Sequence, residues 1–190
     1  FRAIQYAQIV VLVLDADQPL EKQDLTIARR VVDEGRGLVI AINKGDAVKD
    51  RAAALQLVND RLQTSLPQIR GVKIVTISAK TGKGVDRLLP AVFDVFDTWN
   101  TRVPTGALNR WLSGMLEAHP PPMGTHGKRL TIRYATQIKA RPPTFALFSS
   151  TVGKLSDSYL RYLTNGLRDD FGLDGVPIRI ITRSGKNPFI

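Results

Sequence analysis

The sequence contains no cysteine and only two histidines, His119 and His126. The absence of cysteine excludes disulfides, thiol catalysis and Cys-based zinc sites, and two histidines are too few for a His-rich metal site. No apolar run reaches the roughly 18 residues that a membrane-spanning helix needs. We therefore expect a cytoplasmic protein with no membrane partner and no metal ligands, whose chemistry depends on other groups.

The charge of the chain is unevenly distributed. The 190 residues are 43% hydrophobic, enough for one large domain or two small ones, and carry a net charge of +10. Residues 1–100 hold 14 Lys and Arg against 12 Asp and Glu, whereas residues 101–190 hold 13 against 5. The second half therefore has the positive surplus expected of a domain that meets polyanions. A basic surface without a specific partner is the alternative.

In the first half, apolar strands alternate with helical patterns. Three short runs rich in Val and Ile are typical of strands buried on both faces of a parallel sheet, at 8–16, 37–43 and 72–78. Helical patterns follow them, at 19–35, 51–66 and 84–99. Pro90 of the last helix is expected in its first turns or at a kink. This helix is expected to bury one face: Val85, Leu88, Leu89, Val92 and Phe96. This order predicts a doubly wound α/β domain.

The second half has a different pattern. After a linker that contains Pro104, an amphipathic helix is expected over 107–119, and Ser156 is expected to cap a second helix. Strands are expected at 129–135, 144–150 and 177–183. The order α-β-β-α-β predicts a compact α+β domain. The expected domains are therefore residues 1–102 and 103–190.

The four residues Asn43-Lys44-Gly45-Asp46 directly follow the second predicted strand. Guanine presents an N1–H and an exocyclic amino group on one edge, and a fixed carboxylate such as Asp46 can accept both hydrogen bonds. Asn43 would contact the other edge of the purine and brace the loop, and the stem of Lys44 would lie along the base and ribose. An N-K-x-D sequence alone is also compatible with a polar strand-to-helix loop.

A second short sequence, Ser78-Ala79-Lys80, follows the third predicted strand, with 31 residues between Asp46 and Ser78. The backbone N–H of Ala79 could donate to guanine O6 while Lys80 flanks the base. By itself this segment is an ordinary turn. Because the carboxyl ends of adjacent parallel strands meet at one edge of a sheet, the two loops together predict a complete guanine-recognition pair.

The segments that carry these loops resemble the Der (EngA) family of GTPases. "VLVLDADQPLEKQDLTIARRVVDEGRGLVIAINKGD" and "TISAKTGKGVDRLLPAVFDVFDTW" look like the latter part of a translation-factor-like GTPase domain, and "RWLSGMLEAHPPP" and "LTIRYATQIKARPPTFALF" resemble the C-terminal domain of Der. The resemblance covers nearly the whole chain. It implies an incomplete P-loop GTPase-type doubly wound sheet followed by a small α+β KH-like domain. It also implies GTP or GDP as ligand, GTP hydrolysis, and a role in assembly of the large ribosomal subunit.

Family members carry two GTPase domains in tandem, so the resemblance implies as partners the large ribosomal subunit with its RNA and the neighbouring GTPase domains of the same protein. This sequence departs from the family because it contains no P-loop of the form G-x-x-x-x-G-K-[S/T]. We therefore expect the sequence to be the remainder of a longer protein. Mg²⁺ is expected only together with the missing upstream segment, and no residue of this sequence is expected to be catalytic.

Basic residues of the second half are candidates for RNA contact, as the resemblance implies: Lys128, Arg129, Arg133, Lys139 and Arg141. Solvated charges that protect a sheet edge are the alternative for any one of them. The "GTHG" at 124–127 precedes a predicted strand and lacks the helix-GXXG-helix arrangement of RNA-binding KH domains, which argues against the Era family. The alternative function for the whole chain is a basic RNA- or ribosome-binding module that binds no nucleotide.

Overall fold

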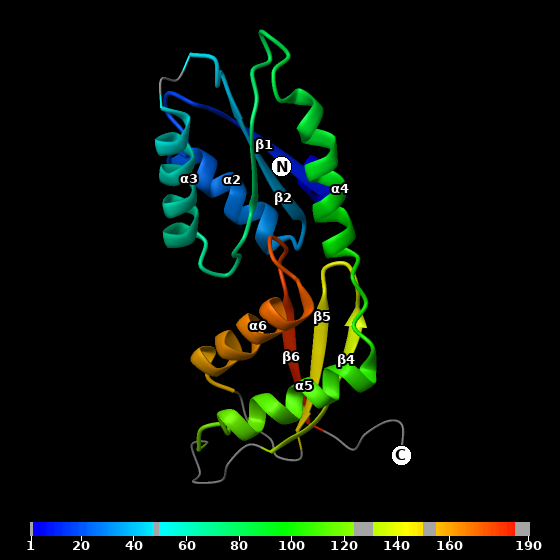
Figure 1. Cartoon of the computed structure of the whole chain (residues 1–190). Helices are drawn as coiled ribbons and strands as arrows, with labels where there is room; N and C mark the ends of the chain where they lie inside the picture. The colour runs from blue at the N-terminus through cyan, green and yellow to red at the C-terminus, as the bar shows by residue number, and fades with distance from the viewer. Residues whose placement is uncertain (1, 48–49, 124–130, 150–154, 185–190) are drawn as a thin grey trace. The chain divides into compact units, whose positions relative to one another are not determined.

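The computed structural model describes residues 2–47, 50–123, 131–149 and 155–184 (Figure 1). The chain folds into two compact units, one made of residues 1–99 with 174–177 and the other of residues 100–173 with 178–190. The predicted domain boundary after residue 102 remains a prediction. No helix in the described ranges is long and apolar enough to cross a membrane.

The first unit is built on a parallel sheet of three strands in the order β1-β2-β3. Its strands are β1 (Ile9–Asp15), β2 (Gly37–Asn43) and β3 (Lys73–Thr76). Its helices are α1 (Arg2–Tyr6), α2 (Lys22–Asp33), α3 (Arg51–Ser65), the 3-10 turn η1 (Val85–Arg87) and α4 (Leu88–Trp99). This arrangement confirms the predicted doubly wound α/β fold.

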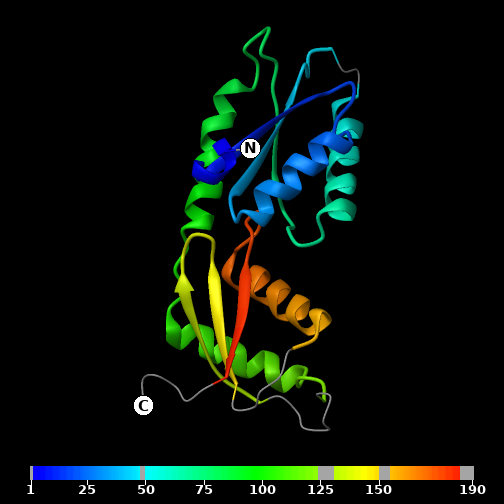
Figure 2. The same cartoon turned by 180° about the vertical axis from the view of Figure 1, so that it is seen from behind.

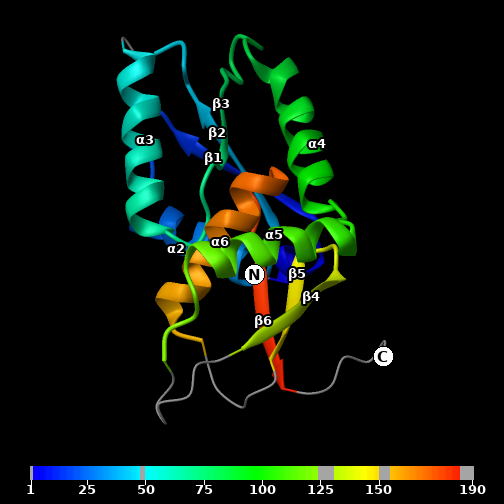
Figure 3. The same ribbon diagram turned by 60° about the horizontal axis from the view of Figure 1, so that its bottom comes forward.

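Strand β2 is the centre of this unit. Leu38, Ile40 and Ile42 belong to a core that they share with apolar side chains of α2 and α3. Val39 and Ala41 point to the opposite face and are equally buried. Figures 1 and 3 show α2 and α3 on one side of the sheet and α4 on the other. Because both faces of β2 are covered, its sequence is a continuous apolar run rather than an alternating one.

Helix α4 differs from the sequence-based expectation in the face that it buries. Pro90 lies in its first turn, as expected. However, Val85 and Leu89 are exposed at 42% and 64%, whereas Val95 and Trp99 are almost fully buried. The indole Nε1 of Trp99 donates a hydrogen bond of 2.8 Å to the buried carbonyl of Gly35. Val85 belongs to the 3-10 turn that precedes the α-helix, so it does not continue the face of the helix. The other residues of the expected face are half-buried: Leu88, Val92 and Phe96.

The second unit contains a three-stranded sheet in the order β4-β5-β6, in which β4 and β5 are antiparallel and β5 and β6 are parallel. Its elements are α5 (Thr105–Ala118), β4 (Ile132–Lys139), β5 (Thr144–Ser149), α6 (Asp157–Phe171) and β6 (Arg179–Ser184). All residues of β5 are buried. Figures 1 and 2, taken from opposite sides, show α5 and α6 on the same face of this sheet. The predicted α-β-β-α-β order is confirmed.

Two details of this unit correct the sequence-based boundaries. The strand expected to end at residue 135 continues to Lys139, so Lys139 ends a strand instead of lying in the following connection. The expected start of that strand at residue 129 lies outside the described residues. Ser156 caps α6 as predicted, since its side chain accepts a hydrogen bond from the backbone of Tyr159.

The side-chain amide of Asn109 joins α5 to the outer edge of β4. The Asn109 side chain accepts a bond of 2.9 Å from the N–H of Ala135 and donates one of 2.9 Å to its carbonyl. Ala135 is fully buried, so these backbone groups need partners inside the protein. Asn109 therefore takes the place of a neighbouring strand at this point of the sheet.

Replacing Asn109 with Ala should lower the free energy of unfolding by about 2–3 kcal/mol, because two buried backbone groups would lose their partners. Urea denaturation measures this change. Asn165→Ala is the matched control, because Asn165 lies on α6 and its side chain makes no hydrogen bond within the described part of the chain. Its effect should stay within about 0.5 kcal/mol. Equal effects of the two substitutions would contradict the role of Asn109.

Candidate functional site

The carboxyl ends of the parallel strands place the predicted guanine loops side by side. Asn43 is the last residue of β2, and Ser78 follows the end of β3 by two positions. Backbone bonds continue the pairing beyond the regular sheet: Ile77 donates to Ile42 at 2.8 Å, and Gly45 donates to Ile77 at 3.0 Å. Ligands of open α/β sheets bind at this edge.

One side-chain hydrogen bond connects the two loops directly. The Asn43 side-chain oxygen accepts a bond of 2.9 Å from the backbone N–H of Ala79. Asn43 therefore braces the loop, as the sequence suggested. The same Ala79 N–H was expected to donate to guanine O6, and that role remains a prediction. If Ala79 donates to the base, it must share its proton with Asn43 or exchange one acceptor for the other.

Lys44 reaches toward the end of β1. Its backbone is left-handed, with φ of 61°. Its ammonium donates to the carboxylate of Asp15, which also accepts a bond of 3.2 Å from the N–H of Asp17. The hydrogen bond from Lys44 holds the pKa of the Asp15 carboxyl below its usual range, and the same bond raises the pKa of Lys44. Sequence reasoning missed Asp15, although its position at the end of the first apolar run was a usable signal.

The first loop requires a glycine at position 45. A Cβ atom at Gly45 would lie 2.6 Å from Cγ2 of Thr76 and 3.2 Å from the carbonyl oxygen of Ile77. Glycine therefore allows this loop to pass close to the end of β3. The next residue, Asp46, is exposed, so its carboxylate is accessible to a ligand.

The second loop is a tight turn organised by Ser78, which is only 2% exposed. Its hydroxyl accepts a bond of 3.2 Å from Thr81, and its backbone N–H donates to Lys83 at 2.9 Å. Gly84 closes the turn with φ of 78°, and a Cβ there would lie 2.4 Å from the Thr76 carbonyl oxygen. Ala79 and Lys80 are exposed at the tip of this turn. Ser78 therefore shapes the turn that presents its two neighbours.

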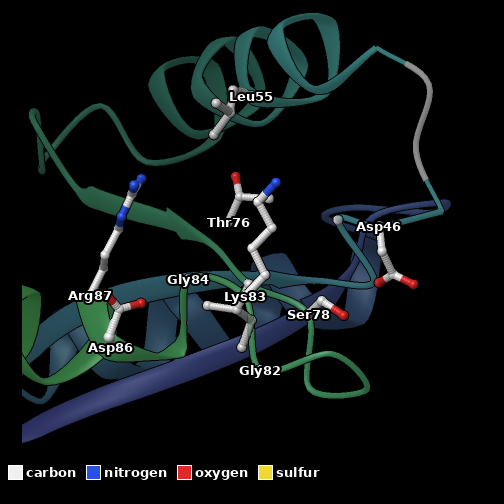
Figure 4. A pocket seen from close by; sticks show the side chains of 11 residues that line it. Asp46, Leu55, Thr76, Ser78, Gly82, Lys83, Gly84, Asp86 and Arg87 are labelled. Atoms are coloured by element: carbon white, nitrogen blue, oxygen red, sulfur yellow. The ribbon is translucent and has the colours of Figure 1, made fainter.

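A pocket of about 510 Å³ lies beside these loops (Figure 4). Figure 4 shows Asp46 and Ser78 at one end of it and Asp86 and Arg87 at the other. Asn43, Lys44, Ala79 and Lys80 do not line it. Lys83 and Arg87 line it and were not predicted as site residues. The pocket thus adjoins the predicted base-recognition loops and includes only part of them. Within the described ranges, no group of three or more His, Asp or Glu side chains could hold a metal ion.

The predicted RNA-contact residues are only partly described. Lys128 and Arg129 lie outside the described residues. Arg133, Lys139 and Arg141 are exposed on β4 and the turn after it. Lys139 and Arg141 line a second pocket of about 380 Å³, whereas Arg133 does not.

Comparison with known proteins gives two family matches. Residues 1–98 match the model of the Elongation factor Tu GTP binding domain. Residues 102–183 match the model of the KH-domain-like of EngA bacterial GTPase enzymes, C-terminal. Together the two matches account for both units of the chain.

Curated relatives match along the same length. GTPase Der of Parvibaculum lavamentivorans is 50% identical over 188 residues, which cover 99% of this chain and 40% of the relative. GTPase Der of Novosphingobium aromaticivorans is 51% identical over 187 residues, which cover 98% of this chain and 40% of the relative. The chain thus spans about 40% of the length of these curated relatives.

A solved structure of Era in complex with MgGDPNP and a segment of 16S ribosomal RNA matches with 14% identity and a TM-score of 0.44. That match covers 98% of this chain and 68% of the Era chain. A score of this size supports no conclusion about function.

The pair of Asp15 and Lys44 gives a testable pH dependence. Because the pKa of Asp15 is lowered, its carboxylate should stay ionised and bound to Lys44 through neutral pH, and the pair should be lost as the pH falls through that lowered pKa. The carboxyl carbon of Asp15 in an NMR titration reports this directly. Lys44→Met should raise the apparent pKa of Asp15. An unchanged titration in that variant would show that Lys44 does not hold the carboxylate.

Proposed function

The chain belongs to the EngA (Der) family of GTPases, and we propose that it supplies the guanine-recognising part of a GTP-hydrolysing protein that acts in assembly of the large ribosomal subunit. The observation that carries the proposal is the hydrogen bond between Asn43 and Ala79. It joins the two loops that the sequence assigned to the base, so that both act as parts of one site at the carboxyl edge of the sheet.

The groups at this edge suit guanine. Asp46 offers an exposed carboxylate that can accept hydrogen bonds from both N1–H and the exocyclic amino group. Asn43 would contact the other purine edge, and the Lys44 stem would cover the base. Ala79 and Lys80 are exposed in a turn held by buried Ser78, which suits a donor to O6 and a flanking cation.

The phosphates and Mg²⁺ would be held by a P-loop segment, which supplies backbone amides and a hydroxyl ligand in GTPases. None of the residues assigned to the base has a proposed role in GTP hydrolysis. This division makes the chain the selective half of the nucleotide site, and the hydrolytic activity belongs to the whole protein.

We propose that the second unit contacts the ribosome in the cytoplasm. Arg133, Lys139 and Arg141 are exposed cations on one strand and its following turn, and cations that replace phosphate counterions gain affinity for RNA. We propose ribosomal RNA of the large subunit and the neighbouring GTPase domains of the same protein as partners of this unit. The contacts of this unit with both partners would depend on the nucleotide that the protein binds.

A second candidate function is a basic RNA-binding module that binds no nucleotide. It is favoured by the internal bonds of two groups that a nucleotide would use. The Ala79 N–H is directed to Asn43, and the Lys44 ammonium is bound to Asp15. A nucleotide would have to compete with both interactions.

Exchanging Asp46 for Asn separates these candidates. In a protein that contains the complete GTP-binding domain, D46N should weaken GDP binding by roughly 100-fold or more, because an amide directs a donor at the donors of guanine. Xanthosine diphosphate, which carries an oxygen at C2, should bind D46N better than GDP does. Isothermal titration calorimetry measures both affinities.

Asp86→Asn is the matched control, because Asp86 lines the same pocket at its other end. It should leave the preference for GDP unchanged. GDP affinity that survives D46N would contradict the guanine assignment. Absence of any nucleotide binding by the unsubstituted protein would favour the RNA-binding module.

A further inference from the structure

The pocket of about 380 Å³ in the second unit has an unusual lining. Three of its six lining residues are cationic and none is acidic: Asn100, Arg102, Ile138, Lys139, Ala140 and Arg141. Two of the cations belong to the end of β4 and the following turn, and Arg102 comes from the segment before α5. Sequence reasoning did not connect Arg102 with the other two, because they are separated by more than thirty positions.

A single amide side chain holds the two walls of this pocket together. The Nε2 group of Gln137 donates to the Thr101 carbonyl at 2.9 Å and to the Lys139 carbonyl at 3.1 Å. Its Oε1 accepts a bond of 2.7 Å from the N–H of Val103. The backbone is therefore fixed on both sides of Arg102 and brought beside the end of β4.

The other side of the turn is fixed as well. The buried Thr144 hydroxyl donates to the Pro142 carbonyl at 2.9 Å, and the Pro143 carbonyl accepts a bond of 2.9 Å from Arg179. Arg141 thus lies between two anchored stretches of backbone.

The three cations have no acidic partner within the described residues. Two lysines of the first unit, in contrast, contact carboxylates: Lys44 binds Asp15, and Lys73 lies 3.4 Å from Asp94. Three like charges around one hollow repel one another and raise the local positive potential. An anion that enters the hollow removes this repulsion.

We propose that this pocket binds a phosphate group of an RNA backbone. A guanidinium is a planar fork of donors that suits the two free oxygens of a phosphodiester, and the Lys139 ammonium adds a third charge. All three cationic side chains are exposed, so a polynucleotide can pass across the pocket. No lining residue is placed to read bases, and the contact fixes position without selecting sequence.

This inference rests on the proposed contact of the second unit with ribosomal RNA. It makes that contact specific: Arg102, Lys139 and Arg141 bind as a group, whereas Arg133 lies outside the pocket. The hydrogen bonds of Gln137 hold the backbone that carries these cations.

The test compares two double variants of the chain that remove the same charge. R102A with R141A empties the pocket of its guanidinium groups. R110A with R161A removes two exposed arginines of α5 and α6 that do not line it. Fluorescence anisotropy with a labelled oligo(U) RNA, measured over a series of KCl concentrations, gives the slope of log K against log salt for each protein.

Each lost phosphate contact should reduce the magnitude of the slope by about 0.7 for a single strand, so the pocket variant, which loses one phosphate, should change by about 0.7 and the control by well under half of that. Equal losses in the two variants, with binding by the unsubstituted chain retained, would overturn the pocket while leaving RNA contact in place. Absence of oligo(U) binding by the unsubstituted chain would overturn both.

A free phosphate ion shares this chemistry, and a second arm distinguishes it. Inorganic phosphate added at constant ionic strength should leave RNA affinity unchanged, because a single ion cannot replace the several contacts of a polynucleotide. Displacement of the RNA by inorganic phosphate in the unsubstituted chain, and not in R102A with R141A, would assign the pocket to the free ion and overturn the RNA assignment.

Discussion

The hydrogen bond from Ala79 to the side chain of Asn43 is the interaction on which the proposed guanine site depends. Parallel strands bring the ends of β2 and β3 to one edge, but a sheet alone does not fix the loops beyond it. This bond fixes one loop against the other, while Gly45 and Ser78 keep each loop compact. Buried Gly45 and Ser78 thus shape the loops that present the exposed residues Asp46, Ala79 and Lys80.

In the second unit, side-chain amides also bond to backbone groups, and there they hold a strand edge and a loop. The amide side chains of Asn109 and Gln137 bond to backbone groups of β4 and of the chain around α5. Among the described residues, no strand pairs with the outer edge of β4, and amides can satisfy both donors and acceptors there. One of these side chains stabilises the buried edge, and the other brings Arg102 to the basic turn. Fold and candidate RNA contact are thus coupled through the same strand.

Local patterns predicted much of this structure. Strand β2 begins and ends at the expected residues, because a run that is buried on both faces is uniformly apolar and is bounded by Gly37 and Asn43. The carboxyl-edge rule correctly placed the two predicted loops side by side, and their role in guanine recognition stays a prediction. The predicted face of α4 was wrong at Val85 and Leu89, which are exposed; Val85 lies in the 3-10 turn before the helix. Gln137 and Arg102 could not be found by spacing, because their partners are distant in sequence and are chosen by tertiary packing.

The most direct test of the central claim follows the backbone amide of Ala79 during titration of the chain with GMP or AMP. ¹H–¹⁵N NMR detects weak binding, so the test does not require the phosphate-binding segment. If the two loops form one guanine site, the amide signals of Ala79 and Asp46 move with GMP and stay in place with AMP. Equal shifts with both nucleotides, or shifts that leave Ala79 unaffected, would contradict the account.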